Sequence, residues 1–191
     1  GYSAVPIVSV ISFFIGRVLA FQGAYQLQQL GATYFVAALV GVSLTRELGP
    51  LITAVVVAGR SGSAFAAEIG TMKVSEEIDA LEVMGLNSVK YLVVPKYLAM
   101  IAMMPCLTLL ADMAGILGGA TFAAGQLDQP FSMYATATSD ALAMKDISTG
   151  LVKSVVFGAV ITTAGRYEGF SVRGGAEGVG EGRAGAPAER L

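Results

Sequence analysis

The sequence lacks histidine and tryptophan and has a single cysteine, Cys106. Without histidine the chain cannot form a Ser-His-Asp triad, ligate haem through histidine or build most zinc sites, so we expect no catalytic or metal-binding residues of these kinds. One cysteine excludes an internal disulfide, and its place in an apolar run predicts that Cys106 is a small packing residue. Charged residues make up only 14% of the chain, against about a quarter in typical soluble proteins.

Apolar residues are abundant instead, at 54% of the 191 residues, and the mean hydropathy is +0.68. One soluble core of this size cannot hide so much apolar surface, so we expect an all-α polytopic membrane protein. A membrane span needs about 20 mostly apolar residues. Four segments meet this requirement: Val5–Gln22, Tyr34–Gly59, Leu92–Ala124 with a tilt or a kink at Pro105, and Ile147–Gly165. The net charge of −2 gives no reason to expect nucleic acid as a partner.

Basic residues indicate the orientation of these spans. They gather in the segment 60–96, which reads as a loop, and in the tail after the fourth span: Arg60, Lys73, Lys90 and Lys96, then Arg166, Arg173, Arg183 and Arg190. By the positive-inside tendency both segments face the cytoplasm. An even number of spans separates them, so the two assignments agree. Arg17 is a charged exception near one end of the first span, where its side chain can reach the interface.

Arg46 and Glu47 lie within the second apolar segment, shortly before Pro50. A charge near the bilayer centre costs about 2.5–3.5 kcal/mol on insertion scales, so such residues normally face a protein interior or a water-filled cavity. Proline lacks an amide N–H and disfavours helical geometry at Gly49, so we expect a kink or a short break here. A broken helix beside ionisable residues is typical of a transport site. The alternative is a loop between two short re-entrant segments.

The segment 75–85 predicts an acidic amphipathic helix of about ten residues, roughly 15 Å long. Ser75 is placed to be its N-cap and Gly85 its C′ residue. Its apolar face consists of Val74, Ile78, Leu81 and Met84, and its polar surface carries Glu76, Glu77, Asp79 and Glu82. Membrane-surface helices usually carry Lys and Arg, so these carboxylates favour a protein partner. The alternative is a helix that lies on the membrane interface without a partner.

Three further features are weaker. Gly115 and Gly119 have the spacing that permits close helix packing. Asp112 and Lys153 lie in different predicted spans; they either pair, line one cavity, or lie near an interface. The sequence contains no G-x-x-x-x-G-K-[ST] motif, so this chain does not bind ATP through a P-loop and we expect no cofactor in it.

Several motifs resemble those of the MlaE (YrbE) permease family. They are RELGP at 46–50, AGRSGSA at 58–64, AEIGTM at 67–72, E-x-DAL at 77–81, LVVP at 92–95, GL-x-KS at 150–154, FG at 157–158 and GGAEGVG at 174–180. They occur in the order expected for that family, and the similarity covers about residues 5–180.

The resemblance implies the membrane subunit of an ABC transporter, not an enzyme, that moves phospholipid or related lipid between membranes from the bacterial inner membrane. It implies a separate ATPase that binds ATP and magnesium, an MCE-domain lipid-binding protein, and a second permease copy. Arg46 and Glu47 would line the lipid pocket between the two copies. The cytoplasmic coupling helix that docks on the ATPase would comprise Ser75, Glu76, Glu77, Ile78, Asp79, Ala80, Leu81, Glu82 and Met84. The transmembrane domain would cover residues 1–170, followed by a Gly-rich segment and tail at 171–191.

The chain also departs from the family pattern. Relatives have an N-terminal interfacial helix and a final hydrophobic helix, whereas this sequence begins at Gly1 and reads as polar and disordered from 181 to 191. We therefore expect a chain shortened at both ends. One alternative is a non-transporting fragment or scaffold that still docks an ATPase. Another is a membrane-embedded enzyme that uses Glu47, Glu68 or Asp112 as an acid or base.

Overall fold

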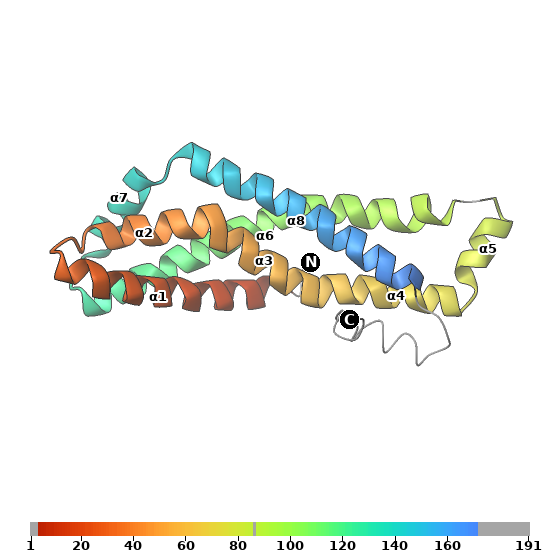
Figure 1. Ribbon diagram of the computed structural model, residues 1–191, viewed down its shortest axis with the longest axis horizontal. Coiled ribbons are helices and arrows are strands. Elements are labelled where there is room, and N and C mark those ends of the chain that lie inside the picture. The colour runs from red at the N-terminus through yellow and green to blue at the C-terminus, as the bar shows by residue number, and fades with distance from the viewer. Residues whose placement is uncertain (1–3, 86, 172–191) are drawn as a thin grey trace, which may run out of the picture. The chain divides into compact units, whose positions relative to one another are not determined.

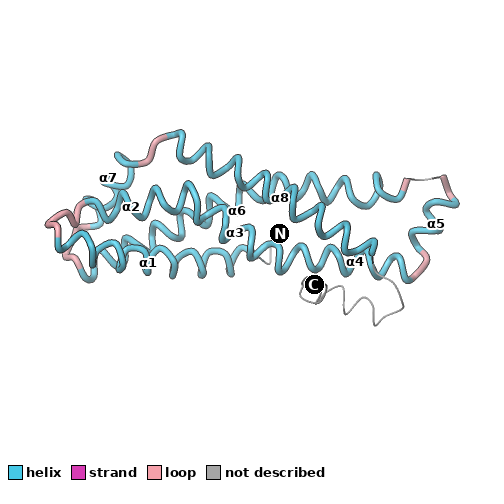
Figure 2. The backbone as a smooth tube through the Cα atoms, viewed as in Figure 1, coloured by secondary structure: helices cyan, strands magenta, loops and turns pink. Residues whose placement is uncertain are grey.

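The computed structural model describes residues 4–85 and 87–171, and every regular element in these ranges is a helix (Figures 1 and 2). The helices are α1 (Val5–Gln29), α2 (Phe35–Ser43), α3 (Gly49–Val57), α4 (Ser63–Val74), α5 (Glu77–Val83), α6 (Ser88–Gln126), α7 (Phe131–Ala141) and α8 (Met144–Ser171). Four helical runs in the described residues are long and apolar enough to cross a membrane: Val5–Gln29, Phe35–Val74, Lys90–Gln126 and Met144–Phe170. The predicted all-α polytopic bundle is confirmed. The predicted tail lies outside the described residues from 172 onward.

The second run is one continuous helix that contains two wider π-helical turns. The first π turn, Leu44–Leu48, joins α2 to α3, and the second, Ala58–Gly62, joins α3 to α4. The expected break at Pro50 is therefore absent, and the alternative of two re-entrant segments is wrong. Gly49 keeps helical angles (φ −59°, ψ −55°) and its N–H bonds to the carbonyl of Leu44, five residues earlier. The wider turn accommodates the proline without ending the helix.

Two helical runs are much longer than a bilayer is thick. The run Phe35–Val74 has 40 residues and α6 has 39, whereas a membrane span needs about 20. Each run is therefore about twice as long as one span requires. The charged segment 60–96 was expected to be a loop, but α4, α5 and the start of α6 occupy most of it. The charged residues of this segment therefore did not end the helices.

The first helix is also longer than expected. It continues to Gln29 rather than Gln22, so Arg17 lies near its middle and not near its end. Its exposed face carries large apolar side chains with exposed fractions between 55% and 66%: Val10, Phe14, Val18, Phe21 and Tyr25. These positions recur every three or four residues, so they form one stripe along α1 suited to contact with lipid.

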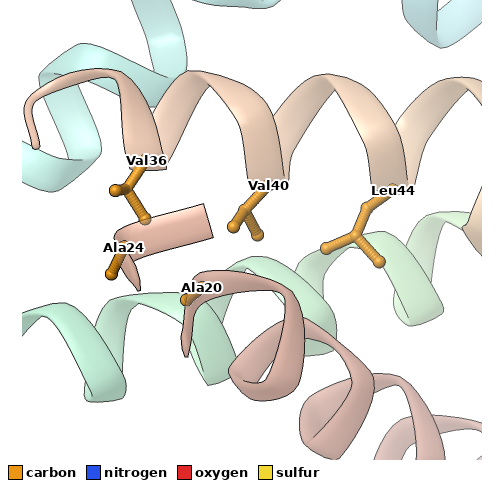
Figure 3. Packing of buried hydrophobic residues seen from close by; sticks show 5 residues of the cluster. All are labelled: Ala20, Ala24, Val36, Val40 and Leu44. Carbon is orange, nitrogen blue, oxygen red and sulfur yellow. The ribbon is translucent and has the colours of Figure 1, made fainter. Parts of the chain in front are cut away.

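The chain divides into two compact units, and unit 1 comprises residues 1–56 and 103–157. Its α2 contacts both α1 and α7. Between α1 and α2 lies the buried cluster Ala20, Ala24, Val36, Val40 and Leu44 (Figure 3). A second cluster joins α2, α6 and α7 through Ala37, Ala120, Ala123, Tyr134 and Ala137.

Glycines set the closest helix approaches in unit 1. A Cβ at Gly16 of α1 would collide with the backbone of Gly115 on α6, and a Cβ at Gly119 would collide with the hydroxyl of Tyr134 on α7. The close packing predicted from Gly115 and Gly119 is therefore confirmed. Cys106 was expected to pack inside, but it is exposed on α6.

Unit 2 comprises residues 57–102 and 158–191. Its buried cluster draws Phe65 and Ile69 from α4, Ile78 from α5 and Val93 from α6. The last turns of α8 pack on the same α4 residues, since a Cβ at Gly169 would press on the Ile69 side chain at 2.8 Å. The short helix α5 thus packs into the buried cluster of unit 2.

Candidate functional site

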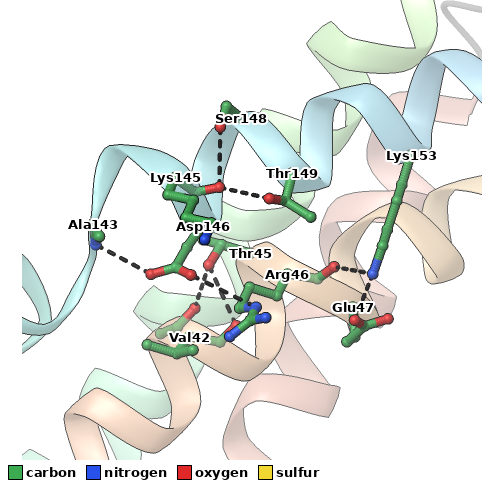
Figure 4. A network of polar contacts seen from close by, with 11 residues as sticks. Val42, Thr45, Arg46, Glu47, Ala143, Lys145, Asp146, Ser148, Thr149 and Lys153 are labelled. Atoms are coloured by element: carbon green, nitrogen blue, oxygen red, sulfur yellow. Dashed lines mark hydrogen bonds and ion pairs between the residues drawn. The ribbon is translucent and has the colours of Figure 1, made fainter.

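One face of α8 lies against the first π turn in unit 1 (Figure 4). The face is formed by Asp146, Gly150 and Lys153, which are four and three residues apart and so lie on one side of a helix. Gly150 allows the close approach, because a Cβ there would collide with the carbonyl of Thr45. The two charged residues of this face therefore reach the π turn on either side of a glycine contact.

Lys153 and Glu47 form an ion pair across the two helices. The Lys153 ammonium donates to Glu47 Oε1 and also to the carbonyl oxygen of Arg46, the latter at 3.1 Å. Figure 4 shows the lysine side chain extended from α8 toward both acceptors. The charge of Glu47 inside a span is thereby matched.

Asp146 gives Arg46 its partner. The Arg46 Nε lies 3.6 Å from Asp146 Oδ1, and Asp146 Oδ2 accepts a hydrogen bond from the Ala143 N–H at 3.2 Å. Asp146 lies in the first turn of α8, where a carboxylate is favoured by the helix dipole. This carboxylate is therefore held by the backbone amide of the residue that precedes α8, and it pairs with the Arg46 guanidinium.

The four charges form a neutral group, which we name the ionic tetrad: Arg46, Glu47, Asp146 and Lys153. Two of its side chains are less exposed, with exposed fractions of 15% for Asp146 and 36% for Lys153. The other two face outward, at 53% for Arg46 and 67% for Glu47. The tetrad thus offers one positive and one negative group, next to each other, within a helical run that is long and apolar enough to cross a membrane.

The structure confirms the position of Arg46 and Glu47 inside a span and supplies the partners that the sequence left open. Lys153 pairs with Glu47, so the predicted alternative in which it pairs with Asp112 is wrong. Asp112 is 7% exposed and lies against Gly49, and its Oδ1 has no hydrogen-bond partner among the described residues. Asp146 was missed. Its spacing from Gly150 and Lys153 is the signal that was available to find it.

The predicted acidic helix is present but shorter. It begins at Glu77 and ends at Val83, a length of seven residues. The prediction of Ser75 as its N-cap is wrong, because α4 continues to Val74 and Ser75 is the C-cap of that helix. The Ser75 hydroxyl donates to the carbonyl of Thr71 at 3.0 Å. Glu76, with φ +60°, makes the sharp turn between the two helices and does not belong to α5.

The two faces of α5 differ from the prediction in part. Ile78 is buried and Leu81 half-buried, whereas Val74 and Met84 are 41% and 65% exposed. Gly85 has φ +76°, as its predicted role at the end of the helix requires. Glu77, Asp79 and Ala80 are exposed. The helix α5 therefore packs on unit 2 mainly through Ile78. Its exposed surface carries the carboxylates and, at its last turn, apolar side chains.

Two lysines tie the helices that carry α5. Lys96 of α6 forms an ion pair with Glu68 of α4 at 2.6 Å, and its ammonium lies 4.9 Å from the centre of the Phe65 ring. Lys73 of α4 donates to the carbonyl of Phe170 near the end of α8. These contacts connect α4, α6 and α8 within unit 2.

Comparison with known proteins gives a consistent family. The model of the family described as Permease MlaE matches residues 1–186. A probable ABC transporter permease protein of Rickettsia bellii is 44% identical over 94% of this chain and 70% of its own length. One of Synechocystis is 39% identical over 95% of this chain and 69% of its own length.

A plant relative extends the comparison. The Arabidopsis thaliana protein TRIGALACTOSYLDIACYLGLYCEROL 1, chloroplastic, is 35% identical over 95% of this chain and 52% of its own length. The matched proteins are described as permeases or named after a glycolipid, and they support a membrane subunit rather than an enzyme. The chain belongs to the MlaE permease family.

Proposed function

We propose that this chain is the membrane subunit of an ABC transporter that moves phospholipid or a related lipid. The observation that carries the proposal is the ionic tetrad, which places Arg46 and Glu47 side by side on the outer face of a membrane-spanning helix. Charged groups at such a position normally serve a substrate path. A lipid headgroup offers a matching charge, and the exposed apolar residues of the spans suit its acyl chains. The name of the plant relative, which refers to a glycolipid, agrees with this substrate class.

A second copy of the chain would cover the tetrad. Exposed charges within a span need shelter from hydrocarbon, and two copies that face each other would enclose a pocket with both tetrads in its wall. An MCE-domain protein would then exchange lipid with this pocket. We propose a bacterial inner membrane as the site of this assembly.

The energy would come from a separate ATPase, because the sequence has no P-loop. The exposed carboxylates of α5 offer it a docking surface, and closure of two ATPase subunits around ATP and magnesium would push on α5. The ties through Lys73 and Lys96 would carry this push into α4, α6 and α8. The permease pair would change shape, and a lipid would move.

Native mass spectrometry of the chain co-purified with an ABC ATPase encoded beside it tests the proposal. We expect a complex of two permeases and two ATPases that retains phospholipid. Arg46→Ala and Glu47→Ala should each reduce the retained lipid about tenfold, which corresponds to about 1.4 kcal/mol of binding free energy, and leave the complex intact.

Asp140→Ala is the matched control, because Asp140 is an exposed carboxylate of unit 1 outside the tetrad. It should leave lipid retention unchanged. A complex that forms without lipid would contradict the transport proposal and indicate a scaffold that only docks the ATPase. Turnover of lipid by the isolated chain would indicate an enzyme instead.

A further inference from the structure

Pro50 follows the first π turn and has no amide N–H to offer a backbone carbonyl. In an α-helix each carbonyl accepts from the N–H four residues later, and for Arg46 that residue is Pro50, which has no N–H. The preceding amide cannot compensate, since the N–H of Gly49 is bonded to the carbonyl of Leu44. The Arg46 carbonyl therefore lacks the donor that it would have in an uninterrupted α-helix, and a polar group from another helix can take that donor's place.

The donor that reaches this carbonyl comes from α8. The Lys153 ammonium lies 3.1 Å from the Arg46 carbonyl oxygen and also bonds the Glu47 carboxylate, the next residue along the π turn. One side chain therefore satisfies a backbone acceptor and orients the neighbouring charged side chain. Its approach depends on Gly150, one turn earlier on α8, where a side chain would strike the Thr45 carbonyl.

We propose that Lys153 is a positioning residue that substitutes for the amide missing at Pro50. By bonding the Arg46 carbonyl it holds the first π turn in register, and by pairing with Glu47 it keeps that carboxylate on the outer face. Two of the three ammonium donors are engaged within the chain. Lys153 thus holds the π turn in position without contacting the lipid. The groups that meet the lipid headgroup are Arg46 and Glu47, and this last step rests on the proposed function.

A double-mutant cycle between Lys153→Met and Pro50→Ala tests the substitution. Methionine keeps the length of the side chain and removes the donor, and alanine restores an amide at position 50. With proline at position 50, Lys153→Met should lower the melting temperature of the purified protein by about 4–8 °C, the scale for losing charge-assisted hydrogen bonds in a chain of this size. In the Pro50→Ala background the loss should be less than half as large, because the backbone then satisfies the Arg46 carbonyl itself.

The Glu47 ion pair is lost in both backgrounds, so it cancels from the cycle. Lys96→Met is the matched control, because Lys96 is also paired with a glutamate but lies in unit 2, away from the Arg46 carbonyl of the first π turn. Its effect should be the same with proline or alanine at position 50. Equal losses for Lys153→Met in the two backgrounds would overturn the proposal.

Lipid retention in the same variants separates this inference from the proposed function. Lys153→Met should reduce retained phospholipid about fivefold, and Pro50→Ala should restore part of it. If the protein retains lipid but the effects of Lys153→Met and Pro50→Ala on the melting temperature simply add, the positioning role alone is refuted. If the two effects depend on each other but the protein never retains lipid, the transport function alone is refuted. If Pro50→Ala does not fold, amide hydrogen exchange decides: Lys153→Met must raise exchange at 47–52 selectively, and unchanged exchange there overturns the proposal.

Discussion

Each of the two units uses a lysine to fasten α8 to the long second helical run. In unit 1 Lys153 of α8 donates to the Arg46 carbonyl, and in unit 2 Lys73 of α4 donates to the Phe170 carbonyl. The donors are chemically identical. The acceptors differ, because Arg46 lies inside a continuous helix, whereas Phe170 is the last residue but one of α8.

The position of the acceptor decides what the contact is worth. The last four carbonyls of any helix lack intrahelical donors, and water can satisfy them when they are exposed. Both lysine–carbonyl contacts are exposed. They differ in the local backbone, because the α-helical donor to the Arg46 carbonyl would be residue 50, which is a proline. We therefore expect the contact to matter more inside the second helical run than at the end of α8.

The carboxylates of the two units differ in a parallel way. Glu47 and Asp146 of unit 1 each have a basic partner, so the tetrad is neutral within the chain. On α5 of unit 2, Glu77 and Asp79 are exposed and form no ion pair among the described residues. Unit 1 thus balances the charges of a candidate membrane span within the chain, whereas α5 of unit 2 has exposed carboxylates without an ion pair among the described residues.

The largest effect should follow from closing the glycine contact of unit 1. Gly150→Leu places a side chain against the Thr45 carbonyl, which is backbone and cannot move aside. Overpacking of about 1–3 kcal/mol or more, together with the displaced Lys153, should lower the melting temperature by about 5–10 °C. Thermal unfolding in detergent measures this. Gly125→Leu is the matched control, since a Cβ at Gly125 meets open space; equal losses in the two variants would show that α8 has no strict contact with the π turn.

Much of this arrangement follows from composition and spacing. Hydropathy and length predict the four spans, because each residue contributes its own transfer free energy wherever it lies. The charge of Arg46 and Glu47 inside the second span is predicted in the same way, as is the close packing at Gly115. Such features depend on single residues or on neighbours in sequence.

The rest depends on contacts between distant segments. In place of the kink or break expected at Pro50 there is a π turn, and it is contacted by Lys153, which lies 107 residues after Arg46. Asp146 joined the site for the same reason, since only the packing of α8 brings it to Arg46. Ser75 is a residue type that favours an N-cap position, but α4 continues to Val74 and Ser75 is the C-cap of that helix. Sequence propensity cannot rank two such competing roles without the tertiary contacts.

A smaller effect should follow from reversing charge on α5. Glu77→Lys together with Asp79→Lys should weaken ATPase recruitment about tenfold at low salt, because both carboxylates are exposed and available to a basic surface. Surface plasmon resonance with the purified ATPase measures this, and the difference should shrink at about 1 M salt as screening shortens to about 3 Å. Glu168→Lys is the control, an exposed carboxylate of unit 2 on α8. If recruitment is unchanged, α5 is not the docking surface and its carboxylates only solvate the turn.

The smallest effect should come from Lys73→Met, and its size relative to Lys153→Met tests the comparison directly. Exposed ionic contacts contribute about 0–1 kcal/mol, so Lys73→Met should lower the melting temperature by less than about 3 °C. We expect water to take over the Phe170 carbonyl once the ammonium is gone, whereas at the Arg46 carbonyl the α-helical donor is already missing because residue 50 is a proline. Thermal unfolding of the two variants in the same lipid nanodiscs gives the ratio. An equal fall in melting temperature for Lys73→Met and Lys153→Met would contradict this comparison. It would mean that the position of the accepting carbonyl within its helix does not set the strength of the lysine–carbonyl contact.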